Sequence, residues 1–475
     1  MPRPSRWIWA AVVLGFVASG CAWTVRATDD VNGGDPDDDV GPAALSDDGR
    51  WVAFESPATD LVAGDTNGVV DVFLHDELVG ITTLVSKKNN GTPNDTNATV
   101  YGISGDGRYV LFGTESQTIT SPTAATELYR YDRQTDSIEV VPGTTPGPGV
   151  LSGDGNTVAI DTEPQVFENT QDEVVDMATG VVSSPPGVWN SHSLSHDGRH
   201  LAHVVYDWND PYYPVHAFVR DLDGGTDVAL GKGASPELSA DGTHVAFVEL
   251  VELTPHNDEP RVSVRRVDDP DSLETIVGHA YASQDIAISG AGRFVSFTST
   301  LVLVGDDSDA LRDMYVFDRL SSTMRLVSRN APGAITDADV FDGAIAGDGR
   351  TVAFTTTAGN MAGAVAGTSQ LYLRSHPRPE VTAVSPSNVA PGASVTLTVS
   401  GSAFMATPMV TVDGGGATVD SVTWVDDGTL LIDVTVAAGA ATGSRDVSVI
   451  NLGTGPGPAA RASSTCTGCL VVTAT

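Results

Sequence analysis

The sequence predicts an all-β protein, a seven-bladed β-propeller followed by an immunoglobulin-like β-sandwich. Three observations support this prediction. A strand-turn-strand pattern returns about every fifty residues between residues 46 and 375, the strands after each turn are apolar on both faces, and the composition changes from Pro379 onward. Four short strands in a unit of roughly 40–50 residues are typical of propeller blades.

Residues 46–86 contain the turn and three of the four strands of one repeat unit. Asp48-Gly49 predicts a two-residue type I′ hairpin turn, because glycine accepts the positive φ that such a turn needs. The strands 51–54, 71–75 and 81–86 follow, with a polar loop before the second of them. The residues before this unit supply a fourth strand, so four antiparallel strands form one blade.

The number of turns gives the number of blades. Seven copies begin in order at Ser46, Ser104, Ser152, Ser195, Ser239, Ser289 and Ala346. Short apolar strands come next, such as 109–112 and 294–297. Strands that are apolar on both faces are expected where each sheet lies between two neighbouring sheets.

The repeat pattern S-x-D-G-R-x-V-A-F, followed by D-V-F-x-x-D, resembles the TolB-type, WD-like β-propeller repeats of bacterial envelope proteins. The resemblance covers roughly residues 24–375 and implies a fold more than a function. Two features depart from TolB itself, since no separate α/β domain precedes the repeats and seven repeats are visible where that family has six blades. The partners of TolB are therefore not carried over.

A segment near the N-terminus is predicted to close the ring of blades. Residues 23–28 resemble the outer strands of the repeats, and Thr24 lies about as far before its turn as they do. The last repeat lacks an outer strand, because Pro377 and Pro379 follow its third strand at 371–374. We therefore expect the N-terminal strand to complete the seventh blade, which removes two exposed edges.

The first 21 residues predict export. Two arginines precede an apolar stretch that is too short for a comfortable membrane span, which is typical of a secretory signal peptide. Gly20-Cys21 resembles a lipobox, which implies lipidation of Cys21 and a lipid anchor to the cell membrane. The alternative is ordinary cleavage after Ala22 or Ala27 and release as a secreted protein. Both place the protein outside the cytoplasm.

The charge balance excludes one class of partner. The chain has 61 Asp and Glu against 25 Lys and Arg, a net charge of −36. Such a surface repels phosphate backbones, so nucleic acid is not an expected partner. It suits cations, although an acidic, solvated shell explains it as well.

Loop lengths indicate which face of the propeller binds. Tight turns join strands one to two and three to four on one face, while the connections from two to three and from four to the next blade are long and emerge on the other. Binding residues are often found on long loops over a rigid scaffold. We therefore expect the long-loop face to be functional.

Two acidic loops on that face suggest calcium, the one cofactor that the sequence raises. Their oxygen-bearing side chains alternate loosely as in a calcium loop, at Asp65, Asn67 and Asp71 and again at Asp306, Asp309 and Asp313. The bidentate Glu of an EF-hand is missing. The alternative is that Asp and Asn cap turns and bind no metal.

Two further loops carry candidate ligands. Four aromatic residues lie within eight positions and suit sugar or peptide stacking, unless they pack on one another: Tyr206, Trp208, Tyr212 and Tyr213. His256 to Glu259 could ligate a metal, with a solvated loop as the alternative.

The C-terminal part, 377–475, is predicted to be a second domain after the propeller at 22–376. Residues 390–401 and Phe404 resemble the start of an IPT/TIG immunoglobulin-like domain, which implies a β-sandwich without active residues. Cys466 and Cys469 could form a local disulfide. A metal site would need two further ligands, and the sequence has no second cysteine pair.

The sequence carries no catalytic signature. It lacks a G-x-S-x-G elbow, an H-E-x-x-H helix and a phosphate loop. We therefore expect an exported, non-catalytic binding or scaffold protein that engages a protein or glycan of the cell envelope. The alternative is a secreted hydrolase or lyase acting on carbohydrate or peptide, and a cluster of carboxylates or histidines at the channel mouth would favour it.

Overall fold

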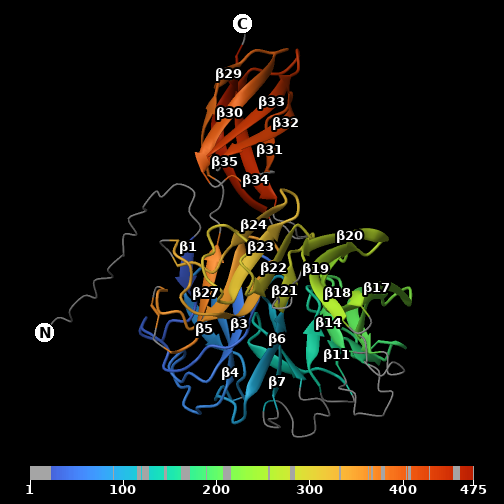
Figure 1. Cartoon of the computed structure of the whole chain (residues 1–475). Helices are drawn as coiled ribbons and strands as arrows, with labels where there is room; N and C mark the ends of the chain where they lie inside the picture. The colour runs from blue at the N-terminus through green and yellow to red at the C-terminus, as the bar shows by residue number, and fades with distance from the viewer. Residues whose placement is uncertain are drawn as a thin grey trace, which may run out of the picture. The chain divides into compact units, whose positions relative to one another are not determined.

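The computed structural model of the chain describes residues 23–473 with short gaps. The gaps are residues 89, 115–118, 120–127, 144–146, 162–171, 189, 207–214, 255–256, 279–283, 331–332, 362, 365–366, 376–379, 403, 405–407, 427 and 453–460. The chain divides into two compact units, one built from strands β1 to β27 and the other mainly from β28 to β35 (Figure 1). Within the described residues, no helix is long and apolar enough to cross a membrane.

The first three blades of the first unit are four-stranded antiparallel sheets. Blade 1 consists of β2 (Ala43–Leu45), β3 (Trp51–Ser56), β4 (Asp71–Asp76) and β5 (Ile81–Leu84). Blade 2 consists of β6 (Ala98–Ile103), β7 (Tyr109–Thr114), β8 (Leu128–Asp132) and β9 (Ser137–Val140). Blade 3 consists of β10 (Gly149–Leu151), β11 (Thr157–Ile160), β12 (Glu173–Asp176) and β13 (Val181–Ser183).

Four more blades follow in the same order. Blade 4 contains β14 (Ser191–Leu194), β15 (His200–Tyr206), β16 (Val215–Asp221) and β17 (Thr226–Leu238). Blade 5 contains the end of β17 with β18 (His244–Thr254), β19 (Asn257–Arg266) and β20 (Asp269–Val277). Blade 6 contains β21 (Gln284–Ile288), β22 (Phe294–Ser299), β23 (Asp313–Asp318) and β24 (Thr323–Leu326). Blade 7 contains β25 (Val340–Ile345), β26 (Thr351–Thr356), β27 (Gln370–Ser375) and β1 (Trp23–Arg26).

Strand β1 completes blade 7, as the sequence predicts. Thr24 pairs with Arg374 and Val25 with Leu373 in an antiparallel register, and the Ala27 amide donates to the Leu371 carbonyl at 3.0 Å. The predicted seven blades are thus confirmed in the described part of the chain. The closure joins the first strand of the unit to its last blade.

The turns between first and second strands are hydrogen-bonded into a closed ring. In each blade a backbone N–H donates to a carbonyl of the next blade. The seven bonds are Asp47 N to Gly105 O (2.8 Å), Gly105 N to Gly153 O (2.7 Å), Asp154 N to His196 O (2.7 Å), His196 N to Ala240 O (2.7 Å), Asp241 N to Gly290 O (2.9 Å), Gly290 N to Gly347 O (2.8 Å) and Asp348 N to Asp47 O (2.8 Å). Seven repeats therefore close without a gap at the hub.

The expected type I′ turn is wrong. In blade 1 the Gly49 amide donates to the Ser46 carbonyl at 3.0 Å, and Gly49 alone has a positive φ, of 67°. The loop is thus a turn followed by a left-handed glycine, the geometry of a longer hairpin loop. The Asp48 carboxylate accepts bonds from the Ser46 hydroxyl (2.8 Å) and the Arg50 amide (3.0 Å), which favours this form.

Blade 5 departs from the expected loop pattern. β17 is one continuous strand that pairs with β16 up to Lys232 and with β18 from Gly233 onward. Gly231 (φ 104°), Ser235 (φ 49°) and an irregular register bend it between the two blades. A bulged strand can bend sharply, so no loop is needed here. The expectation of a long connection is therefore wrong between the fourth strand of blade 4 and the first strand of blade 5. It is also wrong between the second and third strands of blade 5, because β18 and β19 form one long hairpin.

The blades pack through apolar strands that are buried on both faces. Every residue of β4, β22 and β26 is buried. Aromatic residues on the second and third strands stack across the ladder, for example Phe54 on Phe73 at 5.6 Å and Phe354 on Tyr372 at 6.0 Å between ring centroids. Such cross-strand pairs stabilise sheets beyond their burial.

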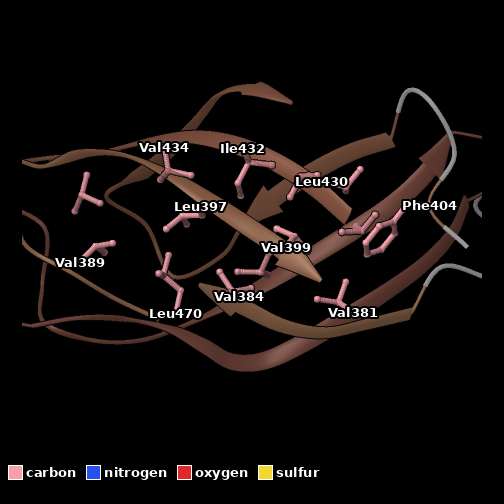
Figure 2. Close-up of a cluster of buried hydrophobic side chains, with 14 of the residues drawn as sticks. Val381, Val384, Val389, Leu397, Val399, Phe404, Leu430, Ile432, Val434 and Leu470 are labelled. Carbon is pink, nitrogen blue, oxygen red and sulfur yellow. The ribbon is translucent and has the colours of Figure 1, made fainter. Parts of the chain in front are cut away.

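The second unit is a β-sandwich. One sheet contains β28 (Glu380–Ser385), β30 (Ser394–Ser402), β33 (Thr429–Val436) and β32 (Ala417–Asp426). The other contains β29 (Asn388–Val389), β35 (Arg461–Val472), β34 (Gly443–Leu452) and β31 (Pro408–Val412). Leu397, Ile432 and Leu470 belong to the buried core that Figure 2 shows between these strands. Cys466 and Cys469 are joined by a disulfide, with Cα atoms 5.6 Å apart.

Candidate functional site

The long-loop face of the propeller is the end at which second strands finish and first strands begin. In blade 1 it carries residues 57–70 and 85–97, and in blade 6 residues 300–312 and 327–339. The tight turns of the hub lie at the opposite end of the same strands. The two acidic loops of the sequence analysis both belong to the long-loop face.

The channel between the first strands is narrowed at the hub end. A cavity of about 260 Å³ there is lined by all seven blades. Asp47 and His196 face each other across it, with Oδ2 and Nδ1 3.7 Å apart. Gly105 and Gly153 leave room for them, because a Cβ would lie 2.3 Å from Asp47 Oδ2 or 2.5 Å from His196 Nδ1. Burial raises the pKa of the Asp47 carboxyl.

Three carboxylates lie at the opposite, long-loop end of the strands, Asp285 and Asp342 on first strands and Glu55 on the second strand of blade 1. Glu55 accepts the amide of Val100 (3.3 Å), Asp285 the hydroxyl of Thr298 (2.9 Å) and Asp342 the hydroxyl of Thr355 (3.2 Å). Burial raises the pKa of each carboxyl, and the charge of Asp342 further raises the pKa of the other two.

Sequence analysis did not single out these three carboxylates, although a signal was present. Asp285 and Asp342 both stand four residues before their hub turns, at Ser289 and Ala346. An acidic residue at the same position of two consecutive repeats, inside an otherwise apolar strand, indicates a shared location beside the channel. Glu55 has no such counterpart and could be found only in three dimensions.

A cavity of about 300 Å³ opens beside two of these carboxylates, between blades 1 and 7. Asp39, Glu55, Phe341 and Asp342 line it. The Phe341 side chain is 44 % exposed. An aromatic face beside carboxylate acceptors can stack on a sugar ring and accept its hydroxyl groups, or receive a cationic group.

The acidic loop of blade 1 gathers the three residues that the sequence singled out. The Asn67 amide nitrogen donates to Asp71 Oδ2 at 2.7 Å and to the Asn94 carbonyl at 2.6 Å. The Asn67 backbone amide faces Asp65 Oδ1 at 3.5 Å. Burial raises the pKa of Asp71 to about 6, and hydrogen bonds from Ser86 and Asn67 oppose the rise.

The acidic loop of blade 6 gathers a different set from the one expected. Asp307, Asp309 and Asp313 each offer a carboxylate oxygen within 4.8 Å of the others, and they form the one such group of three metal ligands found among the described residues. Asp306 lies outside this cluster, in an ion pair with Arg329. Asp307 could have been found by spacing, since it precedes Asp313 by six residues as Asp65 precedes Asp71.

The other predicted ligands are not brought together in the described residues. Tyr206 ends β15 with its side chain 38 % exposed, while Trp208, Tyr212 and Tyr213 lie outside the described residues, as do His256 and Cys21. Asp258 and Glu259 are part of β19. Glu259 is buried and accepts a bond from Arg261 at 2.7 Å, and Asp258 lies 3.7 Å from Lys232.

Comparison with known proteins identifies one domain of this chain. Residues 379–467 match the model of the IPT/TIG domain. No curated protein sequence matches the chain.

Solved structures with similar folds include an oligogalacturonate lyase from Vibrio parahaemolyticus (13 % identity, 76 % of this chain and 99 % of that one, TM-score 0.49). The β-propeller domain of the Trilobed protease from Pyrococcus furiosus has 12 % identity over 71 % of this chain and 95 % of that one, with a TM-score of 0.49. TolB from Acinetobacter baumannii has 18 % identity over 54 % of this chain and 62 % of that one, with a TM-score of 0.35.

The strand ladders and the ring at the hub define the first unit, and the matched domain model defines the second. The chain is a seven-bladed β-propeller protein that carries an IPT/TIG domain at residues 379–467.

Proposed function

We propose that this protein is an exported, non-catalytic binding or scaffold protein of the cell envelope that engages a glycan or protein through its long-loop face. The cavity beside Phe341 is the observation that carries the proposal. It offers an exposed aromatic ring and three acceptor side chains, Asp39, Glu55 and Asp342.

The size of the cavity suits a small part of a larger ligand. At about 300 Å³ it is at the lower end of the range for small-molecule sites. A sugar residue at a chain end or a side chain of a protein partner would fill it. The surrounding long loops would then contact the rest of the partner.

Binding to a panel of immobilised envelope glycans and basic peptides tests the proposal. Phe341→Ala should weaken capture of the bound ligand by about fivefold to 150-fold, since one stacking aromatic contributes about 1–3 kcal/mol at a binding site. Leu320→Ala is the matched control, because Leu320 is 61 % exposed but lies in the β23–β24 turn on the opposite face. Equal effects of the two substitutions would exclude the Phe341 cavity as the binding site.

A hydrolase or lyase remains the second candidate because of Glu55 and Asp342. A carboxyl group with a raised pKa beside a second carboxylate is the pair that glycoside hydrolysis uses. If this candidate is right, the wild type releases new sugar ends from a bound glycan and Glu55→Gln abolishes the release while binding persists. Bound glycan that stays intact over long incubation supports the binding protein instead.

Export and lipid anchoring through Cys21 are part of the proposal and have a separate test. Cys21→Ala should move the protein from the membrane fraction to the soluble extracytoplasmic fraction. A wild type that already partitions into the aqueous phase would contradict the anchor and favour secretion.

A further inference from the structure

The acidic loops of blades 1 and 6 are equivalent position by position. Five residues of blade 1 have counterparts exactly 242 positions later in blade 6: Asp65 and Asp307, Asn67 and Asp309, Asp71 and Asp313, Ser86 and Ser328, Asn94 and Thr336. Their hydrogen bonds also correspond. The hydroxyls of Ser86 and Ser328 both donate to Oδ1 of the buried aspartate, at Asp71 and Asp313.

In blade 1 side chains of the protein itself satisfy the buried carboxylate of Asp71. The Asn67 amide donates one proton to Asp71 Oδ2 at 2.7 Å and faces the Asn94 carbonyl at 2.6 Å. Asp71 thereby has partners on both carboxylate oxygens. The amide group occupies the position where a cation would otherwise be needed.

In blade 6 the same position holds Asp309, which has no proton to donate when ionised. The Asp313 side chain is fully buried, and among the described residues its Oδ2 has no hydrogen-bond partner. Its Oδ1 accepts bonds from Ser328 and from Thr336 (3.3 Å). A buried carboxylate oxygen without a partner is costly, so something that the chain does not supply is expected to bind it.

We propose that blade 6 binds one calcium ion between Asp307, Asp309 and Asp313, and that the equivalent loop of blade 1 binds none. The three carboxylate oxygens lie within 4.8 Å of one another. Two oxygens on opposite sides of one calcium ion are separated by about 4.6–5.2 Å, since Ca–O distances are about 2.3–2.6 Å. The spacing therefore suits calcium.

The surroundings of the site supply further oxygens. The backbone amide of Thr336 donates to the Ser328 carbonyl at 3.1 Å, and that of Asn94 donates to the Ser86 carbonyl at the same distance. Thr336 therefore occupies in blade 6 the position that Asn94 occupies in blade 1. We expect its carbonyl to face the ion as the Asn94 carbonyl faces the amide. Of the two arginines in these loops, Arg329 is bound to Asp306, and the charge of Arg312 acts on the carboxyl of Asp285. Asp309 is half-buried, which leaves a side open for water ligands.

The number of carboxylates around the buried aspartate differs between the two loops. Burial raises the pKa of Asp313 to about 6, and the charges of Asp307 and Asp309 add to the rise. In blade 1 burial likewise raises the pKa of Asp71 to about 6, but the residue equivalent to Asp309 is Asn67, whose hydrogen bond opposes the rise, and only the charge of Asp65 adds to it. The substitution of one amide by one carboxylate thus changes a neutral contact into a repulsive one that a divalent cation would relieve.

The experiment counts calcium ions bound to the full-length mature protein by equilibrium dialysis and by titration calorimetry. The wild type should bind about one ion per chain, with a Kd on the order of 0.1–1 mM as in extracellular modules. Asp309→Asn recreates the blade 1 contact in blade 6 and should bind none, while remaining folded in chelator. Asn67→Asp recreates the blade 6 cluster in blade 1 and should bind about two.

Each departure from this series contradicts the proposal. A wild type that binds no calcium, or an Asp309→Asn variant that still binds one ion, overturns the site in blade 6. Magnesium that binds at this stoichiometry more tightly than calcium overturns the choice of ion. The inference is independent of the partner proposed above, because ion counting requires no glycan or protein ligand.

Discussion

Arg293→Ala should destabilise the propeller far more than the equivalent substitution in blade 4. Arg293 forms two bonds to the Asp318 carboxylate, at 2.9 and 2.8 Å, and the two side chains are only 6 % and 8 % exposed. Arg199 forms the same bidentate pair with Asp221, but there the side chains are 49 % and 21 % exposed. The two blades thus compare one ion pair at two depths.

The expected magnitude follows from the burial of Asp318. Removing one partner of a buried pair leaves an uncompensated charge and costs about 3–5 kcal/mol. With an unfolding entropy of about 2.1 cal/mol/K per residue, a propeller of about 350 residues loses roughly 0.7 kcal/mol per degree, so Tm should fall by about 4–7 °C. Arg199→Ala should leave Tm unchanged within error, because exposed pairs contribute little.

Differential scanning calorimetry of the two variants measures this difference, with the double variant Arg293→Met/Asp318→Leu as control. Replacing a buried pair by apolar residues of similar volume is often neutral, so the control should recover most of the wild-type Tm. Equal Tm values for Arg293→Ala and wild type would refute the reasoning. So would a shift in Arg199→Ala as large as that in Arg293→Ala.

Two further predictions concern the hub. Gly107→Ala should lower the free energy of unfolding by at least about 3 kcal/mol, because φ is 68° and a Cβ there would lie 2.2 Å from Trp51 Cδ1. Gly91→Ala is the control, since φ is 82° but no atom lies within 4 Å of the added Cβ, and it should cost only about 1–2 kcal/mol. Thermal or urea unfolding measures both values. Burial raises the pKa of Asp348 from 3.8 to about 6. Between these two pH values the folded state keeps a proton that the unfolded state has lost. The free energy of unfolding therefore falls as the pH rises from about 4 to about 6. Asp348→Asn should therefore raise Tm at pH about 7 and weaken its decline between about pH 4 and 6; a Tm difference that does not change with pH would contradict this.

The architecture was predictable because it depends on a repeated local pattern. Each hub turn has a Ser or Ala, a glycine and an apolar strand in the same order, and seven copies determine seven blades. The closing strand was predictable as well, since residues 23–28 match the spacing of outer strands and the last repeat lacks one. Both inferences use chain distances, which a repeat protein preserves.

The details that were missed depend on geometry that a single repeat does not specify. Gly231 to Ser235 has the composition of a loop, yet these residues form a bulged part of β17. The spacing to Asp313 could have selected Asp307, but only the fold shows that its neighbour Asp306 forms an ion pair with Arg329. Glu55 and Asp342 meet because blades 1 and 7 are adjacent in the ring.

The pairing of β1 with β27 has a consequence for the order in which the chain acquires its structure. The first strand to leave a ribosome or a secretion channel must wait until a partner about 350 residues later has emerged. Closing a loop of that length costs roughly 5 kcal/mol of chain entropy, so blades 1 to 6 must form first and provide a curved template. Until then both free edges can pair with those of another copy, and strand-exchanged dimers are the expected misfolded product of slow or crowded folding.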